Sequence, residues 1–293
     1  YWAAEESPLY ALQNYTTAGD YLNYGTWNRL NPTPDFRFDG DGYPMVRYNG
    51  VFYFNPVNVA DYALIQYGRM LGGELVAADF LRIADLLITL QDSRGAFLYP
   101  FRYPYYLTGE VLPVGWTSGM AQGMGMSVMA RAYIVTNDAK YLAAGDSALQ
   151  YLLTHETTGG PAGDLSDLDP ALAGLLSLKE FPSTPDYYTL NGFMYTMLGL
   201  YDWWQLPREG AGPPETARVT FHRAVQTLLY TLPYYDVGGF SAYDLGHIIA
   251  GVRPNLQAEY HNIHIYLLHA LHSITGEQRL QCFEELWYSY VKR

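Results

Sequence analysis

Side chains that can transfer protons or bind polar ligands are concentrated in residues 243–266, YDLGHIIAGVRPNLQAEYHNIHIY. This run contains three tyrosines, three histidines, two asparagines and one arginine. Buried polar groups cost stability unless each finds a partner, so an ordinary helical core has no need of such a run. We therefore interpret it as one wall of a concave site.

Two histidines in this run, His261 and His264, are spaced so that they share one face of a helix and could bind a metal ion together. Neither a third ligand nor an HExxH motif accompanies them. We favour a hydrogen-bonded wall of the site, with His261 near the substrate.

The stretch DGDG contains Asp39 and Asp41 and resembles the start of a calcium-binding loop, because hard cations need closely spaced carboxylate oxygens. The glutamate that closes an EF-hand loop is absent. We favour a plain turn, with a structural Ca²⁺ as the alternative.

The charge balance restricts the class of ligand. The chain has 17 basic and 29 acidic residues and a net charge of −12, which disfavours nucleic acid and anionic membranes. Lysines are few, so most of the positive charge is on arginine, the better bidentate partner of carboxylate and sulfate. The 29 tyrosines suit stacking on sugar rings, although packing between helices is the expectation for most of them.

Cysteine usage and hydropathy give further limits. The single cysteine, Cys282, excludes an internal disulfide and a cysteine-based metal cluster. Apolar stretches are too short for a membrane span. The chain starts at Tyr1 rather than Met, which leaves the compartment open, with secretion or envelope association expected if an N-terminal signal was removed.

Hydrophobic periodicity predicts a mainly helical fold. Residues 1–46 lack a sustained period and indicate an irregular N-terminal arm, and 47–293 are predicted to form one domain. Short hairpins are expected at 47–54, around Asn49-Gly50, and at 232–241. The helices should form pairs at 58–70 with 76–90, 117–135 with 139–153, 185–205 with 215–230, and 258–273 with 278–291. The first helices are richer in Gly, Asn, Gln or His, which suggests inner and outer rings: an (α/α) barrel or incomplete toroid of about four helical hairpins.

Four segments should meet where the loops before the inner helices converge: 48–62, 115–125, 179–195 and 243–266. Their motifs, among them EFPSTP, LNGFMYTMLGLYD, YDLGH and YHNIHI, resemble the D-glucuronyl C5-epimerase family (heparosan-N-sulfate-glucuronate 5-epimerase), in particular its C-terminal helical domain. The resemblance spans most of residues 50–290. It implies an (α/α) barrel, an anionic polysaccharide substrate and a homodimer. It also implies a cofactor-independent isomerase that converts D-glucuronate to L-iduronate within a heparosan or heparan-type chain.

Inverting C5 requires two proton transfers. The hydrogen at C5 is alpha to a carboxylate, so a base can remove it while an acid on the opposite face returns a proton. The resemblance places Glu180, Tyr243 and Tyr260 at or beside the catalytic positions. We predict that Glu180 and Tyr260 are the opposed acid and base across the sugar, and that Tyr243 assists or binds. The alternatives are a charge at a helix N-terminus for Glu180 and ordinary packing for the tyrosines.

The chain departs from the family pattern at two positions. Phe181 replaces the tyrosine of the animal enzymes, so it can line the site but supply no proton. The family's arginine after Tyr243-Asp244-Leu245 is Gly246 here. Another arginine must then hold the uronate carboxylate, and the candidates are Arg253, Arg102 and Arg47.

Further substrate-binding residues are expected on the inner helices and their loops. These are Asn191, which could instead bond a neighbouring helix, Gln122, which could reach the cavity between glycines, and Tyr53. Two other functions remain open: a polysaccharide lyase, which shares the first proton abstraction, and a glycan-binding protein without catalysis.

Overall fold

The computed structural model describes residues 13–22, 31–208 and 212–291. Within these ranges the chain is mainly helical, with three small antiparallel sheets. The helices are α1 (Pro56–Leu71), α2 (Ala77–Thr89), α3 (Gly119–Thr136), α4 (Ala139–Leu152), α5 (Leu190–Trp204), α6 (Pro213–Tyr235), α7 (Gly246–Ile249), α8 (Ala258–Thr275) and α9 (Gln278–Val291). The strands are β1 (Phe36–Phe38), β2 (Pro44–Tyr48), β3 (Val51–Tyr53), β4 (Tyr103–Pro104), β5 (Val111–Leu112), β6 (Ala162–Asp164) and β7 (Leu176–Leu178).

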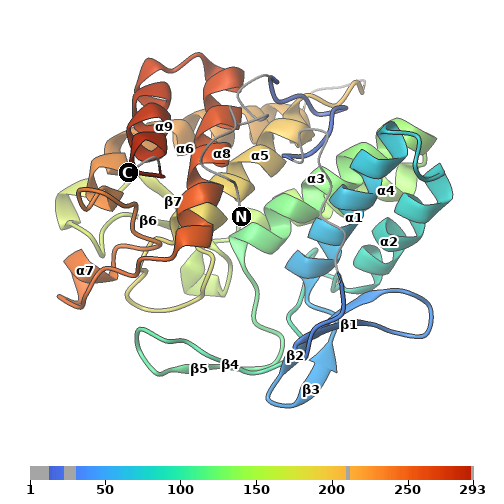
Figure 1. The fold of residues 1–293 in the computed structure, drawn as a ribbon, viewed down its shortest axis with the longest axis horizontal. Coiled ribbons are helices and arrows are strands. Elements are labelled where there is room, and N and C mark those ends of the chain that lie inside the picture. Colours follow the sequence, from blue (N-terminus) through green and yellow to red (C-terminus); the bar gives the residue numbers. More distant parts are fainter. Residues whose placement is uncertain (1–12, 23–30, 209–211, 292–293) are drawn as a thin grey trace.

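The predicted helical pairs are confirmed. Helices α1 and α2, α3 and α4, α5 and α6, and α8 and α9 pack as neighbours, and α1, α3, α5 and α8 contact one another in that order. In Figure 1 the first two pairs fill the right of the view and the last two the upper left. Polar side chains cap three of the helices at their N-termini. Asn55 accepts a hydrogen bond from Val57 N, Ser118 accepts one from Ala121 N, and Asp138 accepts one from Lys140 N.

Helices α3 and α5 approach so closely that their contact requires glycine. A Cβ at Gly123 would lie 2.4 Å from Thr196 Cα, and one at Gly199 would lie 2.0 Å from Gly123 O. Neither distance leaves room for a side chain. The backbones of the two central helices therefore touch, and this contact sets the position of the segment that enters α5.

A buried ion pair joins the same two helices to the N-terminal segment. Arg131 on α3 contacts Asp202 on α5 at 2.7 Å, and both side chains are 0% exposed. The hydroxyl of Tyr15 donates to Asp202 at 2.7 Å. The described part of the predicted arm is thus anchored in the core, while its predicted boundary after residue 46 falls inside β2.

The hairpin around Asn49-Gly50 is confirmed. Strands β2 and β3 pair directly on either side of it, and both turn residues have positive φ, +50° at Asn49 and +83° at Gly50. Nearby, Asp39 Oδ1 accepts hydrogen bonds from the backbone N–H groups of Asp41 and Tyr43. The DGDG stretch therefore forms a turn, and its proposed Ca²⁺ stays a prediction.

Two predicted boundaries are wrong. Helix α5 begins at Leu190 rather than residue 185, because Asp186 is drawn into a buried loop, where it accepts hydrogen bonds from Ser177 Oγ at 2.8 Å and Tyr188 N at 2.9 Å. Helix α6 continues to Tyr235, so the hairpin expected at 232–241 shortens to one bridge between Asp236 and Ser241.

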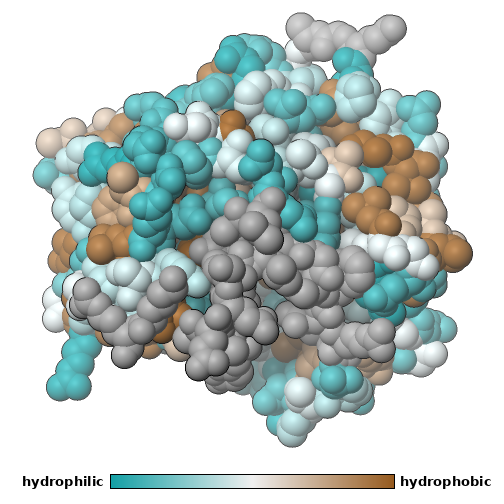
Figure 2. Space-filling model, turned by 45° about the horizontal axis from the view of Figure 1, so that its top comes forward, coloured by the Kyte–Doolittle hydropathy of each residue, from teal (hydrophilic) through white to brown (hydrophobic). Residues whose placement is uncertain are grey.

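The surface in the view of Figure 2 is mixed, with hydrophobic patches toward its edges rather than one continuous apolar face. No helix in the described ranges is both long and apolar enough to cross a membrane. The homodimer stays a prediction.

Candidate active site

A cavity of about 630 Å³ opens between the β4–β5 hairpin and the chain from 243 to 260. Figure 1 shows these two segments at the lower and left parts of the molecule. The residues that line the cavity come from the hairpin and its loop, from the segment between β7 and α5, and from the chain on either side of α7. They are Tyr103, Tyr106, Leu107, Phe181, Tyr243, Val252, Arg253, Asn255, Gln257 and Tyr260.

Tyr243 links this cavity to Glu180. Its hydroxyl donates a hydrogen bond to Glu180 Oε1 at 3.2 Å, and its ring lies 4.5 Å from that of Tyr260. Burial, with the neighbouring Glu180, raises the pKa of Tyr243 well above its usual value and that of Tyr260 to about 12. Both phenols are therefore protonated near neutral pH.

The hydrogen bond leaves no room for a sugar between Tyr243 and Glu180. That Glu180 and Tyr260 are the opposed acid and base stays a prediction, as does the assisting role of Tyr243. Tyr243 and Tyr260 both line the cavity, and Glu180 contacts Tyr243 and lines a neighbouring small pocket.

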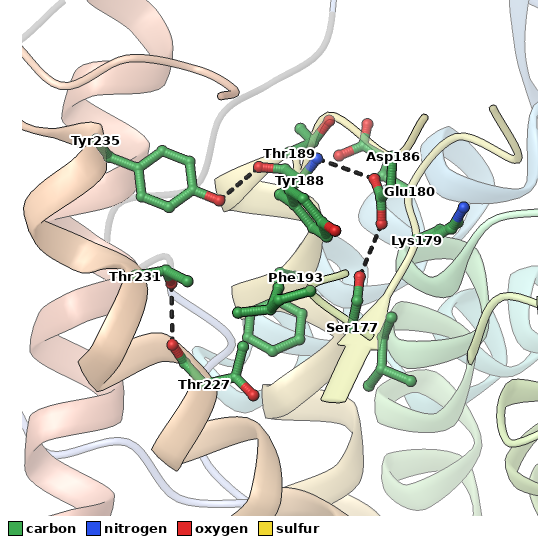
Figure 3. Close-up of a pocket in the computed structure, with 12 residues that line it drawn as sticks. Ser177, Lys179, Glu180, Asp186, Tyr188, Thr189, Phe193, Thr227, Thr231 and Tyr235 are labelled. Atoms are coloured by element: carbon green, nitrogen blue, oxygen red, sulfur yellow. Dashed lines mark hydrogen bonds between the residues drawn. The ribbon is translucent and has the colours of Figure 1, made fainter. Parts of the chain in front are cut away.

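Glu180 lines a small pocket of about 20 Å³ together with Asp186 and Tyr235 (Figure 3). This space is large enough for one water molecule. Burial raises the pKa of Glu180 to about 8, although the Tyr243 hydroxyl and the Gly192 N–H favour its charged form. Its Oε2 atom is buried without a hydrogen bond of normal geometry.

Gly192, in the first turn of α5, makes room for this carboxyl group. A Cβ at residue 192 would lie 2.0 Å from Glu180 Oε2. The predicted LNGFMY motif thus contributes to the site through its glycine, which sequence reasoning did not single out.

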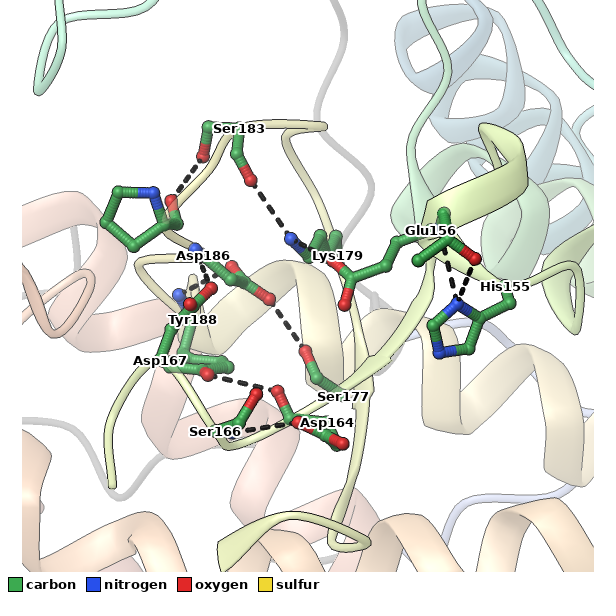
Figure 4. Close-up of polar contacts among 12 residues, drawn as sticks. His155, Glu156, Asp164, Ser166, Asp167, Ser177, Lys179, Ser183, Asp186 and Tyr188 are labelled. Carbon is green, nitrogen blue, oxygen red and sulfur yellow. Dashed lines mark hydrogen bonds and ion pairs between the residues drawn. The ribbon is translucent and has the colours of Figure 1, made fainter. Parts of the chain in front are cut away.

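Lys179 precedes Glu180 but does not neutralise it. Its ammonium group contacts Glu156 at 2.5 Å and donates to Ser183 O at 3.0 Å (Figure 4). Burial raises the pKa of Asp186, on the same loop, to about 6, and the charge of Lys179 opposes that shift. Glu180 is therefore left without a cation in ion-pair contact among the described side chains.

Tyr106, Asp244 and Asn255 form a second hydrogen-bonded group at the cavity. Tyr106, on the loop between β4 and β5, donates a short hydrogen bond to Asp244, and Asn255 donates to Tyr106 Oη at 3.1 Å. A Cβ at Gly246 would lie 2.8 Å from Asp244 Oδ1 and 2.9 Å from Leu107 Cδ2. The hairpin thus occupies the space that a side chain at residue 246 would need.

The three candidate arginines differ in placement. Arg253 is exposed on the cavity wall and forms no ion pair within the described ranges. Arg47 is bound to Asp35 at 2.8 Å. Arg102 is exposed and does not line the cavity.

Four other predicted binding residues do not line the cavity. Gln122 is fully buried, and with its amide oriented to satisfy both partners it bonds Gly95 O and Phe97 N, each at 3.0 Å. Asn191 is buried with its Oδ1 unpaired. Tyr53 packs on Phe101, with their ring centroids 5.5 Å apart.

His261, the fourth of these residues, is hydrogen bonded to Ser241 and Trp287 away from the cavity lining. Its Nδ1 accepts from Ser241 N at 3.0 Å, and its Nε2 bonds Trp287 O at 3.1 Å. The Ser241 hydroxyl also contacts His264 Nδ1 at 2.8 Å. Burial lowers the pKa of His261, and that of His264 to about 3, so both rings are neutral. Across the described residues, no group of three or more His, Cys, Asp or Glu side chains is placed to hold a metal ion.

Sequence reasoning missed Tyr103 and Tyr106 on the cavity wall, whereas Asn255 and Gln257 lie in the 243–266 run that it interpreted as a wall. The dense aromatic run YPYY at 103–106 was the available signal. Phe181 lines the cavity, and its ring centroid lies 4.9 Å from that of Tyr105 and 5.7 Å from that of Tyr103.

The family prediction is confirmed by two comparisons. A family model described as D-glucuronyl C5-epimerase C-terminus matches residues 91–289, which include Glu180, Tyr243 and Tyr260. The D-glucuronyl C5-epimerase of Caenorhabditis elegans is 36% identical over 224 residues, which cover 73% of this chain and 35% of that relative. The match spans about a third of the length of the Caenorhabditis elegans protein. The chain therefore belongs to the D-glucuronyl C5-epimerase family.

Proposed function

We propose that this protein is an isomerase that inverts C5 of D-glucuronate to L-iduronate within a heparosan or heparan-type polysaccharide. The observation that carries the proposal is the hydrogen bond from Tyr243, on the cavity wall, to the buried carboxyl group of Glu180. Family membership supports the same reaction. Acid–base chemistry at C5 needs no organic cofactor, because the sugar's own carboxylate accepts the electron pair.

The first proton transfer runs through Tyr243. As Tyr243 takes the proton from C5, its own phenolic proton moves along the 3.2 Å hydrogen bond to Glu180. The C5–H bond breaks, its electron pair moves into the uronate carboxylate, and Glu180 becomes neutral. In the reverse direction neutral Glu180 returns a proton through Tyr243.

The pKa of Glu180, about 8, suits this exchange because both protonation states are accessible near neutral pH. Proton removal requires the ionised carboxylate. The rate of C5 proton abstraction should therefore rise as pH increases through about 8.

The developing negative charge needs donors aimed at the uronate carboxylate. Arg253, exposed on the cavity wall and without an ion-pair partner among the described residues, can bind that carboxylate in a bidentate manner. Tyr260, protonated below about pH 12, can donate a further hydrogen bond. Arg253 would thus bind the uronate carboxylate in place of the family's arginine, whose position is occupied by Gly246 here.

The fold-level and assembly predictions belong to the same proposal. The succession α1, α3, α5, α8, each with an outer partner, supports an incomplete (α/α) toroid. The polysaccharide substrate, the homodimer and a structural Ca²⁺ at Asp39 and Asp41 remain proposals.

The deciding experiment is incubation with unsulfated heparosan in D₂O, followed by NMR of the polymer. We expect deuterium at C5 together with iduronate. Unsaturated, UV-absorbing chain ends would show a lyase instead. Saturable binding without deuterium incorporation or cleavage would show a glycan-binding protein and overturn the proposed reaction.

A further inference from the structure

The β4–β5 hairpin and the chain that carries Tyr243 both line the cavity, and one buried carboxylate joins them. This carboxylate belongs to Asp244, the residue after Tyr243, which is 1% exposed and does not itself line the cavity. The proposed proton transfers make no use of it. The role inferred for it rests on the proposed epimerase function.

Asp244 is bound by three neutral donors of the protein itself. Its Oδ1 atom accepts a hydrogen bond from Gly246 N at 2.8 Å, and its Oδ2 atom accepts from the Tyr106 hydroxyl and, at 3.4 Å, from Asn255 Nδ2. Hydrogen bonds to an ionised group are roughly twice as strong as those between neutral groups. Because both of its oxygens are occupied away from the cavity, Asp244 can influence a substrate through these neighbours.

The hairpin needs side-chain contacts to hold its place. Two residues of β4 pair with two residues of β5, and an isolated two-stranded hairpin is marginally stable in water. The ring of Tyr105 packs on Phe181 at 4.9 Å. The next residue, Tyr106, is 48% exposed on the loop, and its hydroxyl reaches the buried Asp244. The Tyr106–Asp244 bond therefore fastens the exposed end of the hairpin to the chain after Tyr243.

The same contacts extend to both tyrosines of the proposed reaction. The side chain of Asn255 donates to the Tyr106 hydroxyl oxygen at 3.1 Å, and its backbone carbonyl accepts from Tyr243 N at 2.9 Å. The side-chain oxygen of Asn255 accepts from Gln257 Nε2 at 3.0 Å. Gln257 directly precedes α8, which carries Tyr260. One hydrogen-bonded network thus connects the hairpin with Tyr243 and with the start of α8.

The hydrogen bond from Tyr243 to Glu180 is sensitive to small movements. At 3.2 Å it is longer than the usual distance between a hydroxyl donor and an oxygen acceptor, and its two residues are 63 positions apart in the chain. A small displacement of Tyr243 would therefore interrupt the proposed path of the proton.

We propose that Asp244 is a positioning residue for the reaction. It ties the β4–β5 hairpin to the chain after Tyr243 and so keeps the Tyr243 hydroxyl within hydrogen-bond reach of Glu180. Tyr106 is its partner in this tie. Asp244 itself exchanges no proton with the substrate.

The test is a double-mutant cycle of Asp244→Asn and Tyr106→Phe, with deuterium incorporation at C5 measured on heparosan in D₂O. Each single variant should lower the exchange rate at saturating polymer by about 10- to 100-fold, the cost of misplacing a reacting group slightly. The double variant should be no slower than the slower single variant, because both substitutions break the same tie. KM should change little in Asp244→Asn, because Asp244 does not line the cavity.

Tyr106→Phe also has a readout in pH. The pKa of Glu180 is raised by burial and by the charges of Asp244 and Asp186, and it is lowered by the hydrogen bonds from Tyr243 and Gly192. Tyr106→Phe changes neither charge but loosens Tyr243, so the pKa of Glu180 should increase. The rise in exchange rate should then move to higher pH. A smaller folded fraction would lower the rate without this shift.

The matched control is the pair of Tyr141 and Asp85, in which a phenol donates to a carboxylate at 2.9 Å between α4 and α2. Neither residue lines the cavity or the pocket beside Glu180. Asp85→Asn and Tyr141→Phe should leave the exchange rate and its pH dependence unchanged. Circular dichroism checks the folded content of every variant, and the exposed Tyr106→Phe remains a test if Asp244→Asn does not fold.

The outcomes separate the two proposals. If the wild-type chain exchanges no C5 hydrogen, the epimerase function is overturned and the role of Asp244 with it. If the wild type exchanges and folded Asp244→Asn or Tyr106→Phe matches its rate, the role of Asp244 alone is excluded. Losses that add up in the double variant, or an unmoved pH profile in Tyr106→Phe, would also exclude it.

Discussion

Two buried carboxylates in the helical body have different partners. Asp202 contacts the guanidinium of Arg131 at 2.7 Å and accepts a hydrogen bond from Tyr15. Glu180 accepts one hydrogen bond from the Tyr243 phenol, and the adjacent Lys179 is bound to Glu156 instead. Asp202 is thus paired with a buried cation. Glu180 is paired with the neutral phenol of Tyr243, which lines the cavity.

The difference separates a structural charge from a reactive one. Burial alone would lower the pKa of Arg131, but Asp202 reverses that effect and raises it, so the guanidinium stays charged. Burial raises the pKa of Glu180 to about 8, where a proton can be gained or lost. Perturbed carboxyl groups beside a cavity are characteristic of active sites, whereas matched buried pairs hold elements together.

The largest expected effect is on the structural pair. Arg131→Met leaves Asp202 buried without its cation, which should lower the free energy of unfolding by about 3–5 kcal/mol. The measurement is urea unfolding followed by circular dichroism. Arg218→Met, which breaks the exposed pair with Glu215, should cost at most about 1 kcal/mol. Equal losses in the two variants would remove the structural role assigned to the buried pair.

Glu180→Gln should have the opposite profile. Turnover should fall about 100-fold or more, because the amide cannot accept the proton from Tyr243. Since the pKa of Glu180 is raised in the folded state, its contribution to stability is complete below pH 4.5 and declines as pH rises through about 8. The variant lacks this decline, so its stability relative to wild type should be higher at pH 9 than at pH 5.

Urea unfolding at these two pH values measures that difference, and D₂O exchange measures turnover. A variant with wild-type turnover would exclude Glu180 from proton transfer. A stability difference that does not change with pH would mean that another group titrates in this range.

The smallest expected effect is a shift in pH dependence. The negative charge of Asp186 is one of the groups that raise the pKa of Glu180. Asp186→Asn should therefore move the rise in rate to lower pH, by less than about one pH unit at the effective dielectric of such sites. The matched control is Asp146→Asn, which weakens the contact with Arg208 and should leave the pH profile in place. A shift to higher pH would contradict the electrostatic link.

Much of the fold could be predicted because helical periodicity is local. The four pairs follow from apolar spacing, and the Asn49-Gly50 hairpin follows from turn chemistry. The start of α5 could not be predicted, because Asp186, in a loop, accepts a hydrogen bond from Ser177 on strand β7. Local propensity does not contain that contact.

The site divides in the same way. Motifs identified Glu180, Tyr243 and Tyr260, but the hydrogen bond from Tyr243 to Glu180 depends on a contact across 63 residues. The Tyr106–Asp244 contact spans 138 residues, so no local pattern places the β4–β5 hairpin on the cavity. Arg47 resembled a carboxylate-binding residue until its partner Asp35 was located.

Gly192 brings a helix backbone against the proposed proton acceptor. The Glu180 carboxyl group rests where a methyl group at residue 192 would be, 2.0 Å from the nearest oxygen. Even the smallest side chain there would push the proton acceptor away from Tyr243, while the helix itself would tolerate alanine well. Under the proposed mechanism, the identity of this residue is constrained by the path of a proton rather than by folding. A variant at residue 192 could be fully folded and still inactive.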